Sequence, residues 1–451
     1  MTVLYAEQLL TAQGWVTSAR VHLAGERIAK IESVVAAQAG DEKHDVIVPA
    51  LSNLHSHAFQ RGMAGLAEMR GRTDDDFWSW RDIMYRFASR TSATQLQAIA
   101  AQAYVEMLEA GFCRVGEFHY LHHDVGARRF ADPGEMAGGI AAAAADTGIS
   151  LTLLPVFYAH SAFGGRAPNE GQGRFIHDVD SYARLIERCQ QLVGALPGGI
   201  LGVAPHSLRA VTPEELAPLL RLLPDAPVHI HIAEQVNEVR DCVAWSGRRP
   251  IAWLLENAPV DSRWCLVHAT HMDADEISGV ARSGATVGLC PITEANLGDG
   301  IFPATEFLDA GGQFGIGTDS NVCIGVAGEL ALLEYSQRLA RRARNVIGLQ
   351  GRSTGAALYQ RALVGGHQAL GAEPAGIAAG AIADLVSLTV DDPAMICRSG
   401  DALIDSWLFA GVGRVVDCVW VGAKKQVEQG RHRRRDPVRA AYGKAMKELC
   451  V

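Results

Sequence analysis

From residue 50 to about residue 320, short apolar runs alternate with stretches whose apolar residues recur at helical spacing. The apolar runs predict strands near residues 51–57, 113–119, 151–158, 200–206, 228–233, 264–268, 285–290 and 313–319. Helical spacing predicts helices over residues 94–109, 135–147, 181–196, 213–223, 250–257 and 273–283. Strands that alternate with helices in this way favour an α/β fold of the (β/α)8 TIM-barrel type over an open sheet.

The two ends of the chain have a different pattern. Short strand-like pieces, broken by glycines, occur in residues 1–48 and again in residues 380–428. These pieces predict a small β-sandwich-like domain built from both chain ends. We expect residues 49–375 to form the barrel, and residues 376–451 to complete the small domain and to end in a helix over 434–449.

Composition and charge narrow the class of protein. The chain has 451 residues, 48% of them hydrophobic and 20% charged, which is typical of a globular enzyme. Its net charge of −9 gives no reason to expect nucleic acid or an acidic membrane surface as a partner. The basic run at residues 431–435 is interpreted as the solvated start of the terminal helix.

The apolar runs and the cysteines indicate where in the cell the protein is located. The sequence contains no apolar run long enough to span a membrane and no basic-then-apolar signal pattern at its start. The nine cysteines are scattered, without a CxxC pair, as expected for thiols in a reducing compartment. These features predict a cytoplasmic protein without a membrane partner.

Polar residues follow several of the predicted strands at the point where each strand ends. They are His55, His57, His206, His231, Glu234, His268 and Asp319. Because the carboxyl ends of all barrel strands open on the same face, residues this far apart in sequence are expected to meet at one mouth.

Imidazoles and a carboxylate are ligands for a zinc-like divalent ion that keeps one position open for water, although iron and manganese also accept this set. Such an ion makes water nucleophilic near neutral pH, so hydrolysis is the leading hypothesis. Two ambiguities remain at this point. His55 and His57 would point to opposite sides of a regular strand, and only one of His229 and His231 needs to be a ligand.

The motifs carry a family resemblance that covers nearly the whole chain. Val48-Pro49-Ala50-Leu51 before His-Ser-His, then HxxE, His268 and Gly-Thr-Asp, resembles the deaminase branch of the amidohydrolase superfamily. Ala50 departs from the glycine that many members have. No lysine is placed to be carboxylated and to bridge two metals, which favours a single ion. The stretches 55–62, 77–81, 117–123 and 268–271 are similar to those of formimidoylglutamate deiminases.

The resemblance implies a set of roles. The metal ligands would be His55, His57, His231 and Asp319, holding one divalent ion, most simply Zn²⁺, per subunit, with His229 packed or supporting. Glu234 would move a proton from water to the departing nitrogen; the alternative is a surface glutamate paired with Arg240. His268 is either a further ligand or a proton-sharing group that orients the water together with Asp319, and we prefer the second.

The implied reaction converts N-formimino-L-glutamate and water to N-formyl-L-glutamate and ammonia, in histidine degradation. Arginines bind carboxylates bidentately, so such a dicarboxylate substrate would need them. The candidate substrate-binding residues are Gln60, Arg81, Tyr120, His206 and Arg209. For either arginine, the alternative is a structural ion pair.

Other features leave more than one interpretation. His119, His122 and His123 are expected to shape the site and not to hold a second metal, and residues 77–80 could be packing or a lid. Superfamily members often form dimers, so a homodimer is expected.

Three alternative functions remain. One is another deaminase of this branch acting on guanine, an adenosine derivative or a triazine, which would want stacking groups and few cations. A hydrolase of cyclic amides or dipeptides is disfavoured by the missing bridging lysine. The last alternative is a non-catalytic, metal-free barrel that serves as a binding protein.

Overall fold

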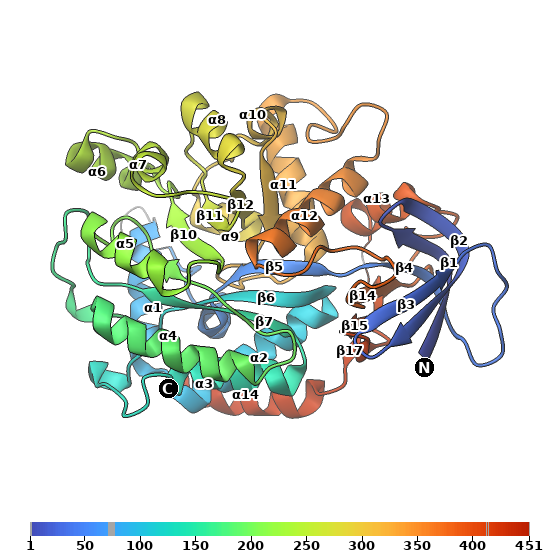
Figure 1. Ribbon diagram of the computed structural model, residues 1–451, viewed down its shortest axis with the longest axis horizontal. Coiled ribbons are helices and arrows are strands. Elements are labelled where there is room, and N and C mark those ends of the chain that lie inside the picture. Colours follow the sequence, from blue (N-terminus) through green and yellow to red (C-terminus); the bar gives the residue numbers. More distant parts are fainter. Residues whose placement is uncertain (1, 71–76, 412, 414, 451) are drawn as a thin grey trace.

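The computed structural model describes residues 2–70, 77–411, 413 and 415–450, and its centre is a closed barrel of parallel strands (Figure 1). The strands are β5 (Leu51–Ser56), β6 (Phe112–His119), β7 (Ser150–Phe157), β8 (Ile200–Leu201), β9 (Ala204–Pro205), β10 (Val228–Ile232), β11 (Trp264–His268), β12 (Thr286–Leu289) and β13 (Gln313–Ile316). Bridges Ser56–Asp319 and Val203–Val228 join the two halves of the barrel, so the predicted (β/α)8 fold is confirmed.

The fourth barrel position differs from the expected single strand over 200–206. It is divided into β8 and β9, which both pair with β7, and Gly202 lies between them. A side chain at Gly202 would collide with Leu154 and with the backbone of Pro227. The close approach of these backbones explains why the strand is interrupted there.

Helices cover the barrel on its outside. They are α1 (Phe77–Arg90), α2 (Ala93–Glu109), α3 (Glu135–Thr147), α4 (Val179–Gly194), α5 (Pro213–Leu222), α6 (Val236–Ser246), α7 (Pro250–Asn257), α8 (Ala274–Ser283), α9 (Pro291–Leu297), α10 (Ala304–Asp309), α11 (Val326–Arg341), α12 (Thr354–Ala369) and α13 (Asp401–Phe409). Short 3-10 turns are η1 (Ala58–Met63), η2 (Val125–Ala127) and η3 (Glu170–Gln172). Of these helices, α2–α5, α7 and α8 correspond to predicted ones, whereas α1, α6 and α9–α13 were not predicted.

Local sequence signals explain where several of these helices begin and end. Capping boxes begin α2 at Ser92 and α8 at Asp273. The helices α3 and α8 end at Gly148 and Gly284, whose φ values of 76° and 75° lie in the left-handed region that glycine adopts without strain.

The two chain ends together form one eight-stranded sheet beside the barrel, in the order β17-β16-β15-β14-β4-β1-β2-β3 (Figure 1). Its strands are β1 (Thr2–Thr11), β2 (Gly14–Ala24), β3 (Arg27–Glu32), β4 (Glu42–Pro49), β14 (Leu385–Leu388), β15 (Val416–Val421), β16 (Lys424–Glu428) and β17 (Arg431–His432). The ends meet where β4 pairs antiparallel with β14. A small domain built from both ends is therefore confirmed, with its strands in one continuous hydrogen-bonded sheet; the exact domain boundaries stay predictions.

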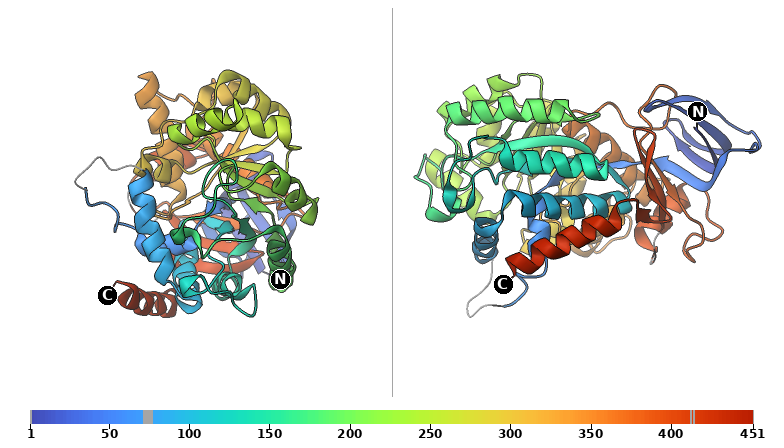
Figure 2. Two further views of the ribbon diagram at one scale, coloured as in Figure 1. Left: turned by 90° about the vertical axis from the view of Figure 1, so that its left-hand side faces the viewer. Right: turned by 90° about the horizontal axis from the view of Figure 1, so that it is seen from below.

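The connection between β4 and β5 shows which end of the barrel faces the small sheet. Strand β4 ends at Pro49 and β5 begins at Leu51, so the small sheet lies at the amino ends of the barrel strands. Their carboxyl ends open on the opposite side. The helix α14 (Arg435–Leu449) packs along α2, where Gln95 donates to Glu448 at 3.0 Å (Figure 2).

Buried side chains fill the barrel interior. Leu54, Cys265, Val267 and Leu370 form one cluster there, and Gly288 and Gly315 have no room for a side chain beside Leu54. No described helix is long and apolar enough to cross a membrane.

Candidate metal centre

Four buried side chains meet at the carboxyl ends of the barrel strands: His55, His57, His231 and Asp319. The Nε2 atom of His55 lies 3.2 Å from Nε2 of His57 and 3.0 Å from Nε2 of His231. The Oδ1 atom of Asp319 lies 3.1 Å from Nε2 of His57 and 3.5 Å from Nε2 of His55. Ligands about 2.0 Å from a tetrahedral ion are about 3.3 Å apart, so this spacing fits a zinc-like ion.

The tautomers of two of these histidines also fit a cation. The Nδ1 atom of His57 lies 2.9 Å from the carbonyl oxygen of Phe118, and Nδ1 of His231 lies 3.1 Å from that of His206. Because a carbonyl oxygen only accepts, each Nδ1 must carry the proton and each Nε2 a lone pair. Burial also lowers the pKa of His55 to about 3 and the pKa of His231 well below its usual value, which favours the neutral, metal-binding form.

The backbone is strained in the turns that carry or adjoin these residues. Positive φ angles occur at Ala233 (50°), His268 (68°), Ala269 (48°), Asp319 (45°) and Asn321 (54°), all at the same mouth. Each such residue costs roughly 1–3 kcal/mol, so the surrounding structure must hold it. The strained turns after β10, β11 and β13 release the chain from strand geometry and direct its side chains toward one point.

Glu234 and His268 lie beside the four donors without belonging to that cluster. The Nε2 atom of His268 lies 3.8 Å from Oε1 of Glu234 and 3.8 Å from Oδ2 of Asp319. Burial raises the pKa of Glu234 to about 7. Burial disfavours the charged form of His268, but Glu234, Glu294 and Asp319 outweigh it and raise the pKa of His268 to about 10. The two side chains thus lie buried next to each other beside the four donors.

The five predicted substrate-binding residues line one cavity together with three of the four donors, His57, His231 and Asp319. This cavity has a volume of about 570 Å³ including its open mouth, and Gln60, Arg81, Tyr120, His206 and Arg209 all contribute to its wall. Gln60 donates to the Tyr120 hydroxyl at 2.7 Å. Five wall residues were not singled out from the sequence: Met84, Tyr85, Tyr158, Phe175 and Leu297. Of these, only Tyr158 had a signal, because it is the last residue of a predicted strand.

The two arginines differ in their surroundings. Arg209 is buried and its Nη1 lies 3.0 Å from Oε2 of Glu238, so the structural ion pair does exist there. Arg81 lies over the Trp78 ring, 4.2 Å from its centroid, and its buried Nε atom has no hydrogen-bond partner within the described ranges. Among the described residues both arginines keep a donor without a hydrogen-bond partner, Nε of Arg81 and Nη1 of Arg209, and Arg209 in addition has the ion pair with Glu238.

Other histidines have structural partners. His229 bonds to the carbonyl oxygen of Ala369 at 2.7 Å, one layer deeper in the barrel than His231. His122 and His123 bond to the carbonyl oxygens of Val156 and Ile176, each at 2.8 Å. His119 is buried, and no possible metal cluster in the described part of the chain contains it.

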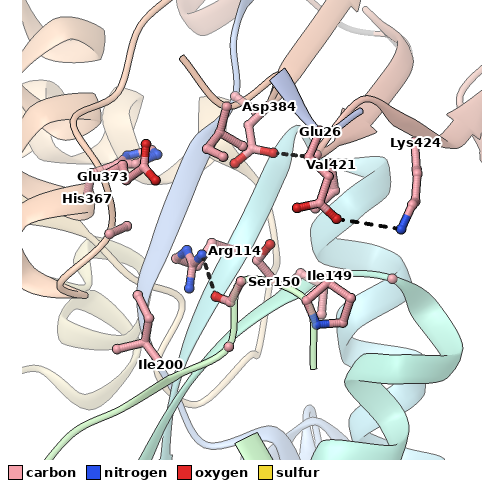
Figure 3. Close-up of a pocket in the computed structure, with 18 of the residues that line it drawn as sticks. Glu26, Arg114, Ile149, Ser150, Ile200, His367, Glu373, Asp384, Val421 and Lys424 are labelled. Atoms are coloured by element: carbon pink, nitrogen blue, oxygen red, sulfur yellow. Dashed lines mark hydrogen bonds and ion pairs between the residues drawn. The ribbon is translucent and has the colours of Figure 1, made fainter. Parts of the chain in front are cut away.

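A larger cavity lies at the other end of the barrel, against the small sheet, with a volume of about 1430 Å³ including its opening (Figure 3). Cys113, His367 and Asp384 come close together there. The guanidinium of Arg114 interacts with all three, and a fixed cation opposes the binding of a metal ion. The four-donor centre is the better metal site.

Comparisons with known proteins agree with this geometry. The model of the amidohydrolase family matches residues 46–428, and that of "Formimidoylglutamate deiminase HutF, N-terminal domain" matches residues 1–45. A formimidoylglutamate deiminase of Pseudomonas aeruginosa is 48% identical, and the alignment covers 100% of both chains. The crystal structure of an amidohydrolase from Brucella melitensis has a TM-score of 0.97 at 56% identity, again covering 100% of both chains. An adenosine deaminase from Xanthomonas campestris with bound zinc has a TM-score of 0.82 at 21% identity, covering 100% of this chain and 98% of that one.

Proposed function

The chain belongs to the amidohydrolase family, and on that premise we propose that it hydrolyses N-formimino-L-glutamate to N-formyl-L-glutamate and ammonia, in histidine degradation. The observation that carries this proposal is that Arg81 and Arg209 line the same cavity as Glu234 and three of the four metal donors, His57, His231 and Asp319. The full-length similarity to a formimidoylglutamate deiminase supports the same substrate.

The metal site would hold one divalent ion, and zinc fits it best. The ligands would be His55, His57, His231 and Asp319, whose spacing and tautomers are described above. When bound, the ion supplies a water nucleophile that is reactive near neutral pH.

The residues beside the ion would transfer protons from the water to the leaving nitrogen. Glu234 takes a proton from the attacking water while the oxygen adds to the formimino carbon. His268 and Asp319 fix the direction of that attack, since His268 Nε2 faces both Glu234 and Asp319. Glu234 passes this proton to the terminal nitrogen, then takes the remaining proton from the added hydroxyl and passes it to the same nitrogen. The carbon–nitrogen bond breaks, and ammonia leaves as the carbonyl forms. One water is consumed for each ammonia released.

The substrate's two carboxylates would be bound by the cationic side of the cavity. Arg81 has a buried Nε without a hydrogen-bond partner in the described part of the chain, whereas Arg209 is already held by Glu238. Gln60, Tyr120 and His206 supply polar atoms on the same wall. We assign Arg81 to direct carboxylate binding, and Arg209 both to binding and to holding the segment that carries Glu234.

The expected surroundings of the enzyme are also part of the proposal. A homodimer is expected because members of the superfamily often form dimers. A cytoplasmic location agrees with nine free cysteines, six of them buried.

A second candidate is deamination of an aromatic base. It is favoured by the aromatic side chains that line the cavity, among them Trp80, Tyr120, Tyr158 and Phe175, on which a purine ring could stack. The buried Nε of Arg81, which has no hydrogen-bond partner among the described residues, argues against it, because an uncharged base would bring no anion to pair with this arginine.

The test is ammonia release by metal-loaded protein, with N-formimino-L-glutamate, guanine and adenosine compared at equal concentration. Release from formimino-glutamate alone supports the proposal, and release from a purine alone overturns the substrate while keeping the metal chemistry. N-formimino-glycine, which lacks the side-chain carboxylate, is the matched control. Equal kcat/KM for the two formimino compounds would overturn the role assigned to the arginines.

A further inference from the structure

We propose that Glu294 is a positioning residue that keeps a proton on Nδ1 of His268 and fixes the orientation of its ring for the reaction. The inference rests on the proposed function for its kinetic part, but its structural part can be tested without any substrate.

The contact between the two residues is direct and buried. The Oε1 atom of Glu294 lies 3.2 Å from Nδ1 of His268, and side-chain exposure is 8% and 1% respectively. A carboxylate can only accept, so Nδ1 of His268 carries the proton in this contact. The other ring nitrogen, Nε2, is thereby left facing Glu234 and Asp319.

Glu294 is itself held in place by the chain around it. Its Oε1 atom also accepts from the backbone N–H of Cys290 at 2.8 Å, at the residue that precedes α9. Pro291 begins that helix and Gly298, with a φ of 70°, ends it. Glu294 is therefore presented from a short, rigid helix directly after β12, and its carboxylate has little freedom to turn away.

His268 needs such a support because its own backbone does not orient it. Its φ of 68° and that of Ala269, 48°, place both residues outside strand geometry. One face of the ring stacks on His231, with centroids 5.5 Å apart. Stacking limits the tilt of the ring but does not fix its rotation within its own plane or which nitrogen faces Glu234. The hydrogen bond from Nδ1 to Glu294 fixes both.

A purely structural role for Glu294 would be to accept from Cys290 N–H and so begin α9. The variant Glu294→Gln separates the two roles, because its amide oxygen can still accept from Cys290 while the negative charge opposite His268 is lost. Glu329→Gln is the matched control. Glu329 is equally buried, and it accepts from the backbone of Ile292 in the same helix at 2.9 Å, but it has no contact with His268 among the described residues.

The experiment uses the full-length, metal-loaded protein and three variants: Glu294→Gln, Glu294→Asp and Glu329→Gln. We expect Glu294→Gln to keep its metal content and KM while kcat falls about 10- to 100-fold. Glu294→Asp should recover part of that loss, and Glu329→Gln should keep the wild-type kcat. A loss of kcat in Glu329→Gln equal to that in Glu294→Gln would overturn the proposal, because the effect would then follow from disturbing α9.

The substrate-free readout is nuclear magnetic resonance of the protein labelled with ¹⁵N-histidine, with the His268 signals assigned from their absence in His268→Asn. In the wild type we expect a protonated Nδ1 whose proton signal lies far downfield because it is bonded to a carboxylate, and in Glu294→Gln an upfield shift of that signal, because the neutral amide oxygen accepts a weaker hydrogen bond. A wild-type spectrum in Glu294→Gln would overturn the proposal. If the wild type fails to hydrolyse formimino-glutamate, the proposed function fails alone, and the spectra still decide the role of Glu294.

Discussion

The backbone carbonyl of His55 accepts from the N–H of Asp319 at 2.9 Å, while the side chains of the same two residues are 3.5 Å apart at the metal centre. His55 ends the first barrel strand and Asp319 follows the last one. The contact that closes the barrel is therefore also part of the metal site. A substitution that separates β5 from β13 should therefore lower both the stability of the barrel and its affinity for the metal.

Gly317→Ala tests this coupling. An added Cβ at Gly317 would lie 2.8 Å from the His55 carbonyl oxygen and 2.9 Å from its Cβ, so the strands must separate. We expect a loss of about 1–3 kcal/mol in the free energy of unfolding, together with weaker zinc binding. Urea denaturation and metal titration measure the two effects. The control is Gly138→Ala, where α3 has open space around the position and neither quantity should fall.

Glu234→Gln should separate proton transfer from metal binding. The amide keeps the size of the side chain but cannot take a proton, so kcat should fall by a factor of about 10² to 10⁴. Zinc content and thermal unfolding should stay at wild-type values, because Glu234 is not among the four donors. Turnover at the wild-type rate would remove Glu234 from the mechanism.

The two arginines should respond differently to substitution. Arg81 has ring contacts and a free Nε, so Arg81→Met should raise KM for formimino-glutamate with little loss of stability. Arg209→Met leaves Glu238 buried without its cation and should cost about 3–5 kcal/mol. The double variant Arg209→Met/Glu238→Gln should recover part of that stability but not the KM. Chemical denaturation and steady-state kinetics on all three variants make the comparison.

Acid should destabilise the protein in part through His367. Burial lowers its pKa from 6.5 to about 4, so below pH 6.5 the unfolded chain binds a proton that the folded protein refuses. Stability from this group is therefore complete above pH 6.5 and falls as the pH drops toward 4, by up to about 1.4 kcal/mol per pH unit. His367→Gln should flatten the dependence of unfolding free energy on pH in this window. An unchanged slope would contradict the assignment.

The site residues at the strand ends could be predicted from the sequence. The topology of a barrel brings the carboxyl ends of its strands together, regardless of the segments that connect them. His55, His231 and Asp319 each follow an apolar run, and the fold alone places them at one mouth. The fourth strand was harder, since its interruption at Gly202 depends on how closely Leu154 and Pro227 approach. That distance is a tertiary property and leaves no periodic signal.

The parts of the site that come from outside the strands could not be predicted in this way. Trp80 and Tyr85 lie on α1, and helical periodicity does not say that this helix lies over the mouth. Glu294 is separated from His268 by 26 positions and belongs to a seven-residue helix. Their contact follows from how α9 starts after β12. Similarly, alternating strand patterns at the two chain ends do not reveal that β4 and β14 join them into one sheet.

Asn321 should set the affinity for the metal without being a ligand. Its Nδ2 atom donates to the carbonyl oxygens of Asp319 and His57, at 3.1 and 3.2 Å, and to the Ser56 hydroxyl at 3.1 Å. These bonds hold the left-handed turn that aims Asp319. Asn321→Ala should therefore weaken zinc binding about 10- to 100-fold, the range typical of residues that support ligands. Removing zinc with a chelator should lower the melting temperature of the wild type more than that of Asn321→Ala at limiting zinc, because binding stabilises the folded state in proportion to RT ln(1 + [Zn]/Kd). The same zinc affinity in both proteins would show that the turn holds Asp319 without Asn321.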